Sequence, residues 1–251
     1  MPLEQVLVLL TAAAGAGWVD AVVGGGGLLQ LPAILMTGMP TVEAMATNKL
    51  SSVFGTASAA VTYTRSTKVD RQVVIPGAAL AVVSAGLGAW AAAAISADVL
   101  RPAVMVVLLA VAAFVTLRPA MGAVPVPHLR TGPRVGVAVA TAGVGIAFYD
   151  GIMGPGTGTF LIIAFTTILG LDFVSASASA KIINVGTNVG ALVVFGAQCS
   201  GRSGSAWRCA TWPGPSSARG WRSSRGASFV RIVLLCVVVA MVVRLGWQQF
   251  A

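Results

Sequence analysis

The sequence contains very few charged residues. They make up 9% of the 251 residues, whereas hydrophobic residues make up 57% and the mean hydropathy is +0.89. About a quarter of the residues in a typical soluble domain are charged. A chain with so few charges has nowhere to expose its apolar surface except lipid. We therefore exclude a soluble domain and expect a membrane protein.

Histidine and cysteine are also scarce. His128 is the single histidine, and the three cysteines are Cys199, Cys209 and Cys236. None of the cysteines has metal-ligand spacing with a histidine, which argues against a zinc site and a Ser–His–Asp centre. A disulfide framework is equally unsupported. We expect no metal, no cofactor and no enzymatic activity.

A basic segment at the start of the chain is missing as well. Residues 1–5 carry only the acidic Glu4, whereas a cleaved signal peptide begins with positive charge. The first apolar run, residues 6–23, is therefore expected to stay in the protein as a helix.

Long apolar runs predict the transmembrane helices, because a bilayer-spanning helix needs about 20 mostly apolar residues. The predicted spans are residues 3–22, 42–63, 73–95, 99–117, 135–149, 174–195 and 228–247. Two shorter runs, residues 28–39 and 159–171, come after glycine-rich loops and are predicted to be re-entrant or broken half-helices. The expected fold class is all-α, a polytopic transmembrane bundle of about eight helices.

The net charge of +9 reflects basic residues that lie between the apolar runs. We interpret them as topology signals rather than as a nucleic-acid surface. The positive-inside rule places two loops on the cytoplasmic face, and their basic residues are Arg65, Lys68 and Arg71 in one and Arg118, Arg130 and Arg134 in the other. The expected localisation is the bacterial inner membrane.

One segment, residues 199–225, does not fit this pattern. It contains five arginines, three of the six tryptophans and no acidic residue, and apolar sequence resumes directly after it. One interpretation is a long basic cytoplasmic loop. The other is a frameshift, because Leu-Ala and Val-Ala codons of a GC-rich gene, shifted by one base, encode Trp, Arg, Cys, Gly, Ser and Pro. The frameshift hypothesis predicts that a transmembrane helix was lost here.

The two halves of the chain resemble each other. WVDAVVGGGGL at 18–28 parallels FYDGIMGPGTG at 148–158, and ATNKLSS at 46–52 parallels ASAKIIN at 178–184. We expect residues 1–117 to form a first repeat, 118–134 a cytoplasmic linker and 135–251 a second repeat. Repeats of this kind in transporters place the binding site where the repeats meet, on interrupted helices.

The glycine-rich loops predict an anion site. Glycine lets backbone N–H groups approach a ligand closely, and a half-helix that starts after such a loop directs its positive end at the ligand. Buried lysines add positive charge, and amide and hydroxyl groups donate hydrogen bonds. The predicted substrate-binding residues are Gly24, Gly25, Gly26, Gly27, Asn48, Lys49, Gly154, Gly156, Thr157, Gly158, Lys181, Asn184 and Asn188. Asp20 and Asp150 are predicted to couple transport to protons.

Each of these predictions has a structural alternative. The glycines are also compatible with tight helix crossing alone. The two aspartates are also placed to cap the glycine loops. Lys49 and Lys181 are equally compatible with pairing to those aspartates as a structural clamp, or with snorkelling to an interface.

At these motifs the chain resembles the sulfite exporter TauE/SafE family, and within it the branch of probable membrane transporters. The resemblance rests on VDAVVGGGGLLQLPAILMTGMP (19–40), ATNKLSS (46–52), FYDGIMGPGTGTF (148–160) and ASAKIINVGTN (178–188). It implies about eight transmembrane helices and movement of sulfur-containing or other organic anions across the cytoplasmic membrane. The departure is again 199–225, where the family carries a penultimate apolar helix.

The expected function is secondary transport of a small anion, with a sulfur oxyanion or a sulfonate as substrate class. The expected partners are the lipid bilayer, the anion and protons, with no nucleic acid. A passive anion channel and a non-transporting membrane partner or assembly protein are the alternatives. A channel differs from a carrier in that it need not saturate or show counterflow.

Overall fold

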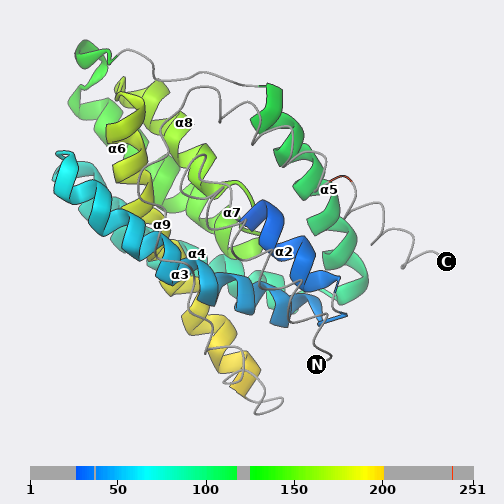
Figure 1. The fold of residues 1–251 in the computed structure, drawn as a ribbon. Coiled ribbons are helices and arrows are strands. Elements are labelled where there is room, and N and C mark those ends of the chain that lie inside the picture. The colour runs from blue at the N-terminus through cyan, green and yellow to red at the C-terminus, as the bar shows by residue number, and fades with distance from the viewer. Residues whose placement is uncertain (1–26, 37, 118–124, 201–238, 240–251) are drawn as a thin grey trace.

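A computed structural model describes residues 27–36, 38–117, 125–200 and Val239. Within these ranges the chain is helical and contains no strand, which confirms the all-α fold (Figure 1). The helices in chain order are α2 (Gly27–Leu35), α3 (Thr41–Ser66), α4 (Arg71–Ala94), α5 (Ala97–Leu117), α6 (Gly132–Ala140), η2 (Thr141–Ile146), α7 (Ala147–Ile152), α8 (Thr157–Leu169) and α9 (Phe173–Ser200), with one short turn, η1 (Pro127–Leu129), before α6.

Three of the described helices are long and apolar enough to cross a membrane: Arg71–Ala94, Gly132–Ile152 and Phe173–Gly196. Large apolar side chains of α4, including Val83 and Trp90, are exposed on its surface. Exposed apolar side chains along a long helix are typical of a surface that faces lipid. The chain is a polytopic membrane protein, as its composition predicts.

The second of these helices is continuous but not regular. Residues 132–152 join α6, η2 and α7, and η2 is a π-helical turn over Thr141–Ile146. The prediction of a helix over 135–149 was therefore correct in place but short by three residues at each end. A π turn inserts an extra residue into the helix and rotates the residues after it, which here sets the direction of Asp150.

Two helices are too short to span a bilayer. Helix α2 has nine residues and α8 has thirteen. They lie at the runs 28–39 and 159–171, so short helices are present where both half-helices were predicted, and their re-entrant course remains a prediction. Gly154 and Gly156, with φ of 89° and 79°, turn the chain into α8 in a conformation that favours glycine.

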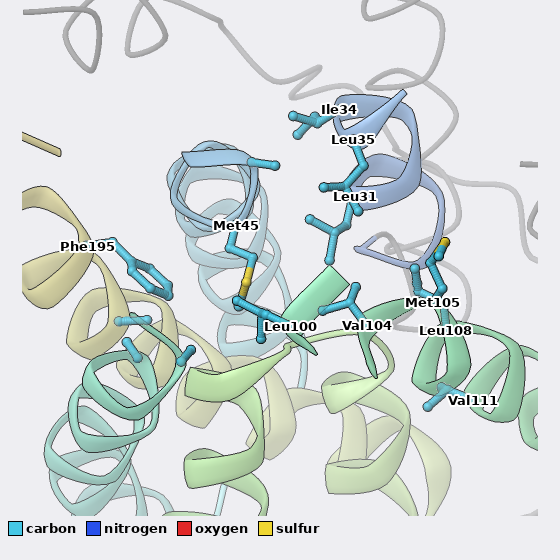
Figure 2. Packing of buried hydrophobic residues seen from close by; sticks show 14 residues of the cluster. Leu31, Ile34, Leu35, Met45, Leu100, Val104, Met105, Leu108, Val111 and Phe195 are labelled. Carbon is cyan, nitrogen blue, oxygen red and sulfur yellow. The ribbon is translucent and has the colours of Figure 1, made fainter. Parts of the chain in front are cut away.

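An apolar cluster holds the first half-helix, α2, in place. Its buried residues Leu31 and Leu35 belong to one cluster with Met45 of α3 and with Leu100 and Val104 of α5 (Figure 2). These contacts fix the position of α2 in the described structure.

A second apolar cluster holds the other half-helix, α8. Its buried residues Leu161, Phe165 and Leu169 pack with Ala138 of α6 and Ile183 of α9. Because the two clusters fix the bodies of α2 and α8, the first residues of both helices are able to face a common site.

Helix α4 is the packing centre of the described structure, and glycines let its neighbours approach it closely. A Cβ atom at Gly151 of α7 would overlap the carbonyl oxygen of Ala85, and one at Gly190 of α9 would overlap that of Val82. Small residues at such crossings allow backbone-to-backbone packing in membranes. Gly151 and Gly190, which lie outside the two glycine-rich loops, therefore serve close helix crossing.

The two cytoplasmic loops predicted from their basic residues meet in the structure. Arg130 donates from Nε to Asp70 Oδ2 at 2.6 Å, and from Nη2 to Gln72 Oε1 at 2.9 Å. Asp70 also caps α4 by accepting from the backbone N–H of Gln72. The hydrogen bond with Asp70 raises the pKa of Arg130 above its usual value. These contacts place both loops at the same end of the bundle.

Matching residues of the two repeats differ in how far neighbouring helices bury them. With Lys49 aligned to Lys181, Phe54 corresponds to Gly186 and Ser58 to Gly190. Gly186 and Gly190 are buried against α4, whereas Phe54 is 59% exposed and Ser58 is also exposed. Among the described residues, one side of α3 therefore has no helix packed on it as α4 packs on α9.

This asymmetry is the one expected if the second repeat has no counterpart of α4, as the frameshift hypothesis for 199–225 predicts. Residues 201–225 lie outside the described residues, so the hypothesis remains a prediction. Cys209 and Cys236 lie outside them as well.

The close crossing of α4 and α9 gives a stability prediction. Gly190→Ala should destabilise the protein by about 1–3 kcal/mol, because the added methyl group forces the two backbones apart. Gly196→Ala is the matched control on the same helix, since a Cβ there meets nothing within 4 Å. Thermal unfolding in detergent measures both. Equal melting temperatures for the two variants would contradict the assigned role of Gly190.

Candidate functional site

All but one of the predicted site residues in the described part of the chain line one small cavity, and the exception is Lys181. The volume of the cavity is about 30 Å³, and it lies among α2, α3, α7, α8 and α9. The residues that line it are Gly27, Asn48, Lys49, Ser52, Thr56, Asp150, Gly154, Gly156, Thr157, Gly158, Asn184 and Asn188. Ten of these were predicted from the sequence, and they come from both repeats.

A buried ion pair crosses this site. Lys49 Nζ of α3 lies 2.5 Å from Asp150 Oδ2 of α7, and the two side chains are only 3% and 2% exposed. A buried charge is costly unless a partner compensates it. The pairing joins a lysine of the first repeat to an aspartate of the second. Of the alternatives left open by the sequence, the structure supports pairing for Lys49 and excludes snorkelling.

The other carboxylate oxygen of Asp150 contacts the start of α8. Thr157 Oγ1 lies 2.6 Å from Asp150 Oδ1 and 2.8 Å from the carbonyl oxygen of Gly154. Among the described residues no backbone N–H donates to the Asp150 carboxylate, so the role of loop cap that the sequence left open is not seen there. The carboxylate is instead held between a lysine and a threonine.

The loop that precedes α8 is fixed by its own contacts. Tyr149 donates its hydroxyl hydrogen to the carbonyl oxygen of Pro155 at 2.6 Å, and its ring packs edge-on against Phe160. A Cβ at Gly154 would lie 3.1 Å from Lys49 Nζ. Gly154 also has a positive φ, so another residue would be strained there. The loop therefore brings backbone close to the lysine.

Polar side chains of α3 and α9 complete the lining. Asn188 Nδ2 donates to Thr56 Oγ1 at 3.3 Å, which joins the two helices across the cavity. Asn48 is buried beside Gly27 of α2, and its Oδ1 has no hydrogen-bond partner within the described structure. The cavity thus combines one paired lysine and aspartate with several amide and hydroxyl groups.

Ser52 and Thr56 were missed by the sequence prediction. Two signals point to them. They come after Asn48 at intervals of four residues, which places all three on one face of α3. They also lie three and seven residues after Lys49, the same spacing that relates Asn184 and Asn188 to Lys181.

Other predicted residues are not brought to the cavity. Lys181 is buried in α9 but is not among the lining residues. Asp20, Gly24, Gly25 and Gly26 lie outside the described residues, so their roles remain predictions.

The model of the sulfite exporter TauE/SafE family matches residues 9–245. The chain belongs to this family. It is a membrane transporter by this membership, which is consistent with the expectation that it is not an enzyme. No solved structure matches the chain.

Several relatives carry transporter names. The chain is 35% identical over 240 residues to "Probable membrane transporter protein ORF9" of Sinorhizobium sp, covering 94% of this chain and 90% of that protein. It is 34% identical over 189 residues to "Probable membrane transporter protein YfcA" of Escherichia coli K12, covering 75% and 69%. A "Probable membrane transporter protein" of Haemophilus influenzae is 27% identical over 254 residues, covering 99% and 98%.

The ion pair gives a second stability prediction. Lys49→Met alone should destabilise the protein by about 3–5 kcal/mol, because it leaves the Asp150 carboxylate buried without its partner. Asp150→Leu alone should destabilise the protein to a similar extent, because it leaves the charge of Lys49 buried without its partner. The double variant Lys49→Met/Asp150→Leu should be more stable than either single variant. Thermal unfolding in detergent measures all three, and additive losses in the double variant would contradict direct coupling of the two charges.

Proposed function

We propose that this chain is a secondary transporter of the bacterial inner membrane that carries a small anion, a sulfur oxyanion or a sulfonate. The proposal depends above all on the position of Lys49, a buried lysine that lines a polar cavity between elements of both repeats. Ionisable groups inside membrane proteins are costly and by default mark a functional pathway.

The size of the cavity supports a small substrate. A water molecule needs about 10–15 Å³ of such space, so a cavity of about 30 Å³ accommodates roughly two water-sized groups. This suits a compact oxyanion or the head group of a sulfonate. A larger ligand requires the surrounding helices to move.

The lining chemistry supports an anion. Lys49 supplies positive charge, and the amides of Asn184 and Asn188 and the hydroxyl of Ser52 supply hydrogen-bond donors. The first residues of α8 also line the cavity, and the start of a helix favours negative charge. The name of the family, which refers to sulfite export, agrees with this substrate class.

The energy for transport is proposed to come from an ion gradient. The sequence contains no Walker A motif, since no Gly-Lys-Ser/Thr comes after its glycine-rich loops. Asp20 and Asp150 are the candidates for coupling to protons. Asp150 directly contacts the lysine that the anion would use.

Transport in proteoliposomes tests the proposal. Labelled sulfite should be taken up saturably by the wild-type protein, should be competed by related anions and should show counterflow. Asn184→Ala should raise KM about tenfold or more, because it removes a hydrogen bond to a charged ligand. The double variant Lys49→Met/Asp150→Leu leaves neither charge buried without a partner. It should nevertheless lose uptake.

Lys68→Ala, a change of an exposed loop lysine, is the matched control and should transport like the wild type. Uptake that neither saturates nor shows counterflow would assign a channel instead. If the wild-type protein transported neither sulfite nor any related anion, the transport proposal would be wrong and a non-transporting partner would be favoured.

A further inference from the structure

We infer that the cavity selects a singly charged oxyanion that also carries a hydrogen-bond donor, and that Oδ1 of Asn188 accepts the donated hydrogen. This inference rests on the proposed function and narrows its substrate class. Among sulfur oxyanions, hydrogensulfite fits this description and the sulfite dianion does not. Among sulfonates, those with an N–H or O–H group close to the sulfonate fit it.

The charge of the site favours a monoanion. Among the described residues that line the cavity, Lys49 is the one basic residue and Asp150 the one acidic residue. The two are paired at 2.5 Å, so together they give the site no net charge. A bound monoanion therefore adds one uncompensated charge, whereas a dianion adds two. Because an uncompensated buried charge is costly, the site discriminates against the dianion.

Thr56 fixes the orientation of the Asn188 amide. The Thr56 hydroxyl donates to the backbone carbonyl oxygen of Ser52 at 2.7 Å and also lies 3.3 Å from that of Val53. Its hydrogen is thus directed into α3, and its oxygen is left to accept. Asn188 Nδ2 donates to this oxygen at 3.3 Å. With Nδ2 on the side of Thr56, Oδ1 of Asn188 is directed elsewhere.

The Asn188 oxygen is available to a ligand. Asn188 is 2% exposed and lines the cavity, and no donor reaches its Oδ1 within the described structure. A buried acceptor without a donor is unfavourable. A ligand hydrogen removes this penalty, whereas a ligand that offers only acceptors leaves it in place. The second hydrogen of Nδ2 remains for an oxygen of the same anion.

Other acceptors around the cavity favour the same kind of ligand. Oδ1 of Asn48 is buried and has no hydrogen-bond partner in the part of the chain that the structure describes. The ionised carboxylate of Asp150 also only accepts. The cavity thus presents acceptors as well as a lysine, and an anion with one hydrogen of its own complements both.

Asn184, one turn earlier on α9, has a different environment. The Thr187 hydroxyl donates to Asn184 Oδ1 at 3.1 Å, so this oxygen already has a donor. Its Nδ2 is therefore the group that is left for the anion. Asn184 and Asn188 share a residue type, a helix and the cavity, but only Asn188 is expected to recognise a hydrogen on the ligand. Asn184 is therefore the matched control.

Sulfamate and methanesulfonate test this inference, because both are monoanions of nearly the same shape and they differ in an amino group against a methyl group. Each is measured as a competitor of labelled sulfite uptake into proteoliposomes at one fixed pH. In the wild type, half-maximal inhibition should need about tenfold less sulfamate than methanesulfonate, because only sulfamate donates a hydrogen to Asn188.

Asn188→Leu should bring this ratio to about one, because leucine fills similar space without an acceptor. Asn184→Leu should weaken both competitors and leave the ratio unchanged. Thr56→Val should also lower the ratio, since the Asn188 amide loses the partner that orients it, whereas Thr56→Ser should keep the wild-type ratio. If Asn188→Leu does not fold, the two Thr56 variants decide by the same comparison.

A wild-type ratio of about one would overturn the inference, as would a wild-type ratio in a transporting Asn188→Leu variant or in Thr56→Val. In these cases labelled sulfite is still taken up and the proposed function stands. Wild-type protein that takes up no labelled sulfite would instead overturn the proposed function, and the inference with it.

Discussion

The buried ion pair between Lys49 and Asp150 is the interaction on which the rest of the site depends. It joins α3 to α7, and so connects the two halves of the chain at the cavity. Neither charge is stable at this depth alone. Polar groups of both repeats lie around the pair, so any anion that enters the cavity meets a lysine already compensated by a carboxylate.

The packing of the helices fixes the geometry of this pair. Apolar clusters hold α2 and α8, while α7 and α9 approach α4 closely through glycine. The π turn before α7 and the positive φ of Gly154 and Gly156 set the positions of Asp150 and of the start of α8. The irregular backbone of the chain thus lies beside the polar cavity, where protein covers it.

Much of this was predictable from local patterns. The composition and apolar runs predicted an all-α membrane bundle, and the glycine loops predicted the half-helices. The repeat predicted that Lys49 and Asp150 lie at one site. It did not predict that Lys49 pairs with the aspartate of the other repeat, because such a contact depends on how the helices cross. Ser52 and Thr56 were missed although their helical spacing indicated them. The helix at 132–152 was longer than predicted because polar residues near its ends hid its true length.

Calorimetric titration of the purified protein with sulfite, in two buffers of different ionisation enthalpy and at a pH at which hydrogensulfite predominates, is the most direct test of the proposal that Asp150 couples anion binding to protons. The difference between the buffers gives the number of protons taken up for each anion bound. We predict uptake of about one proton by the wild type and none by Asp150→Asn. Binding of sulfite by both proteins with the same proton uptake would contradict the coupling.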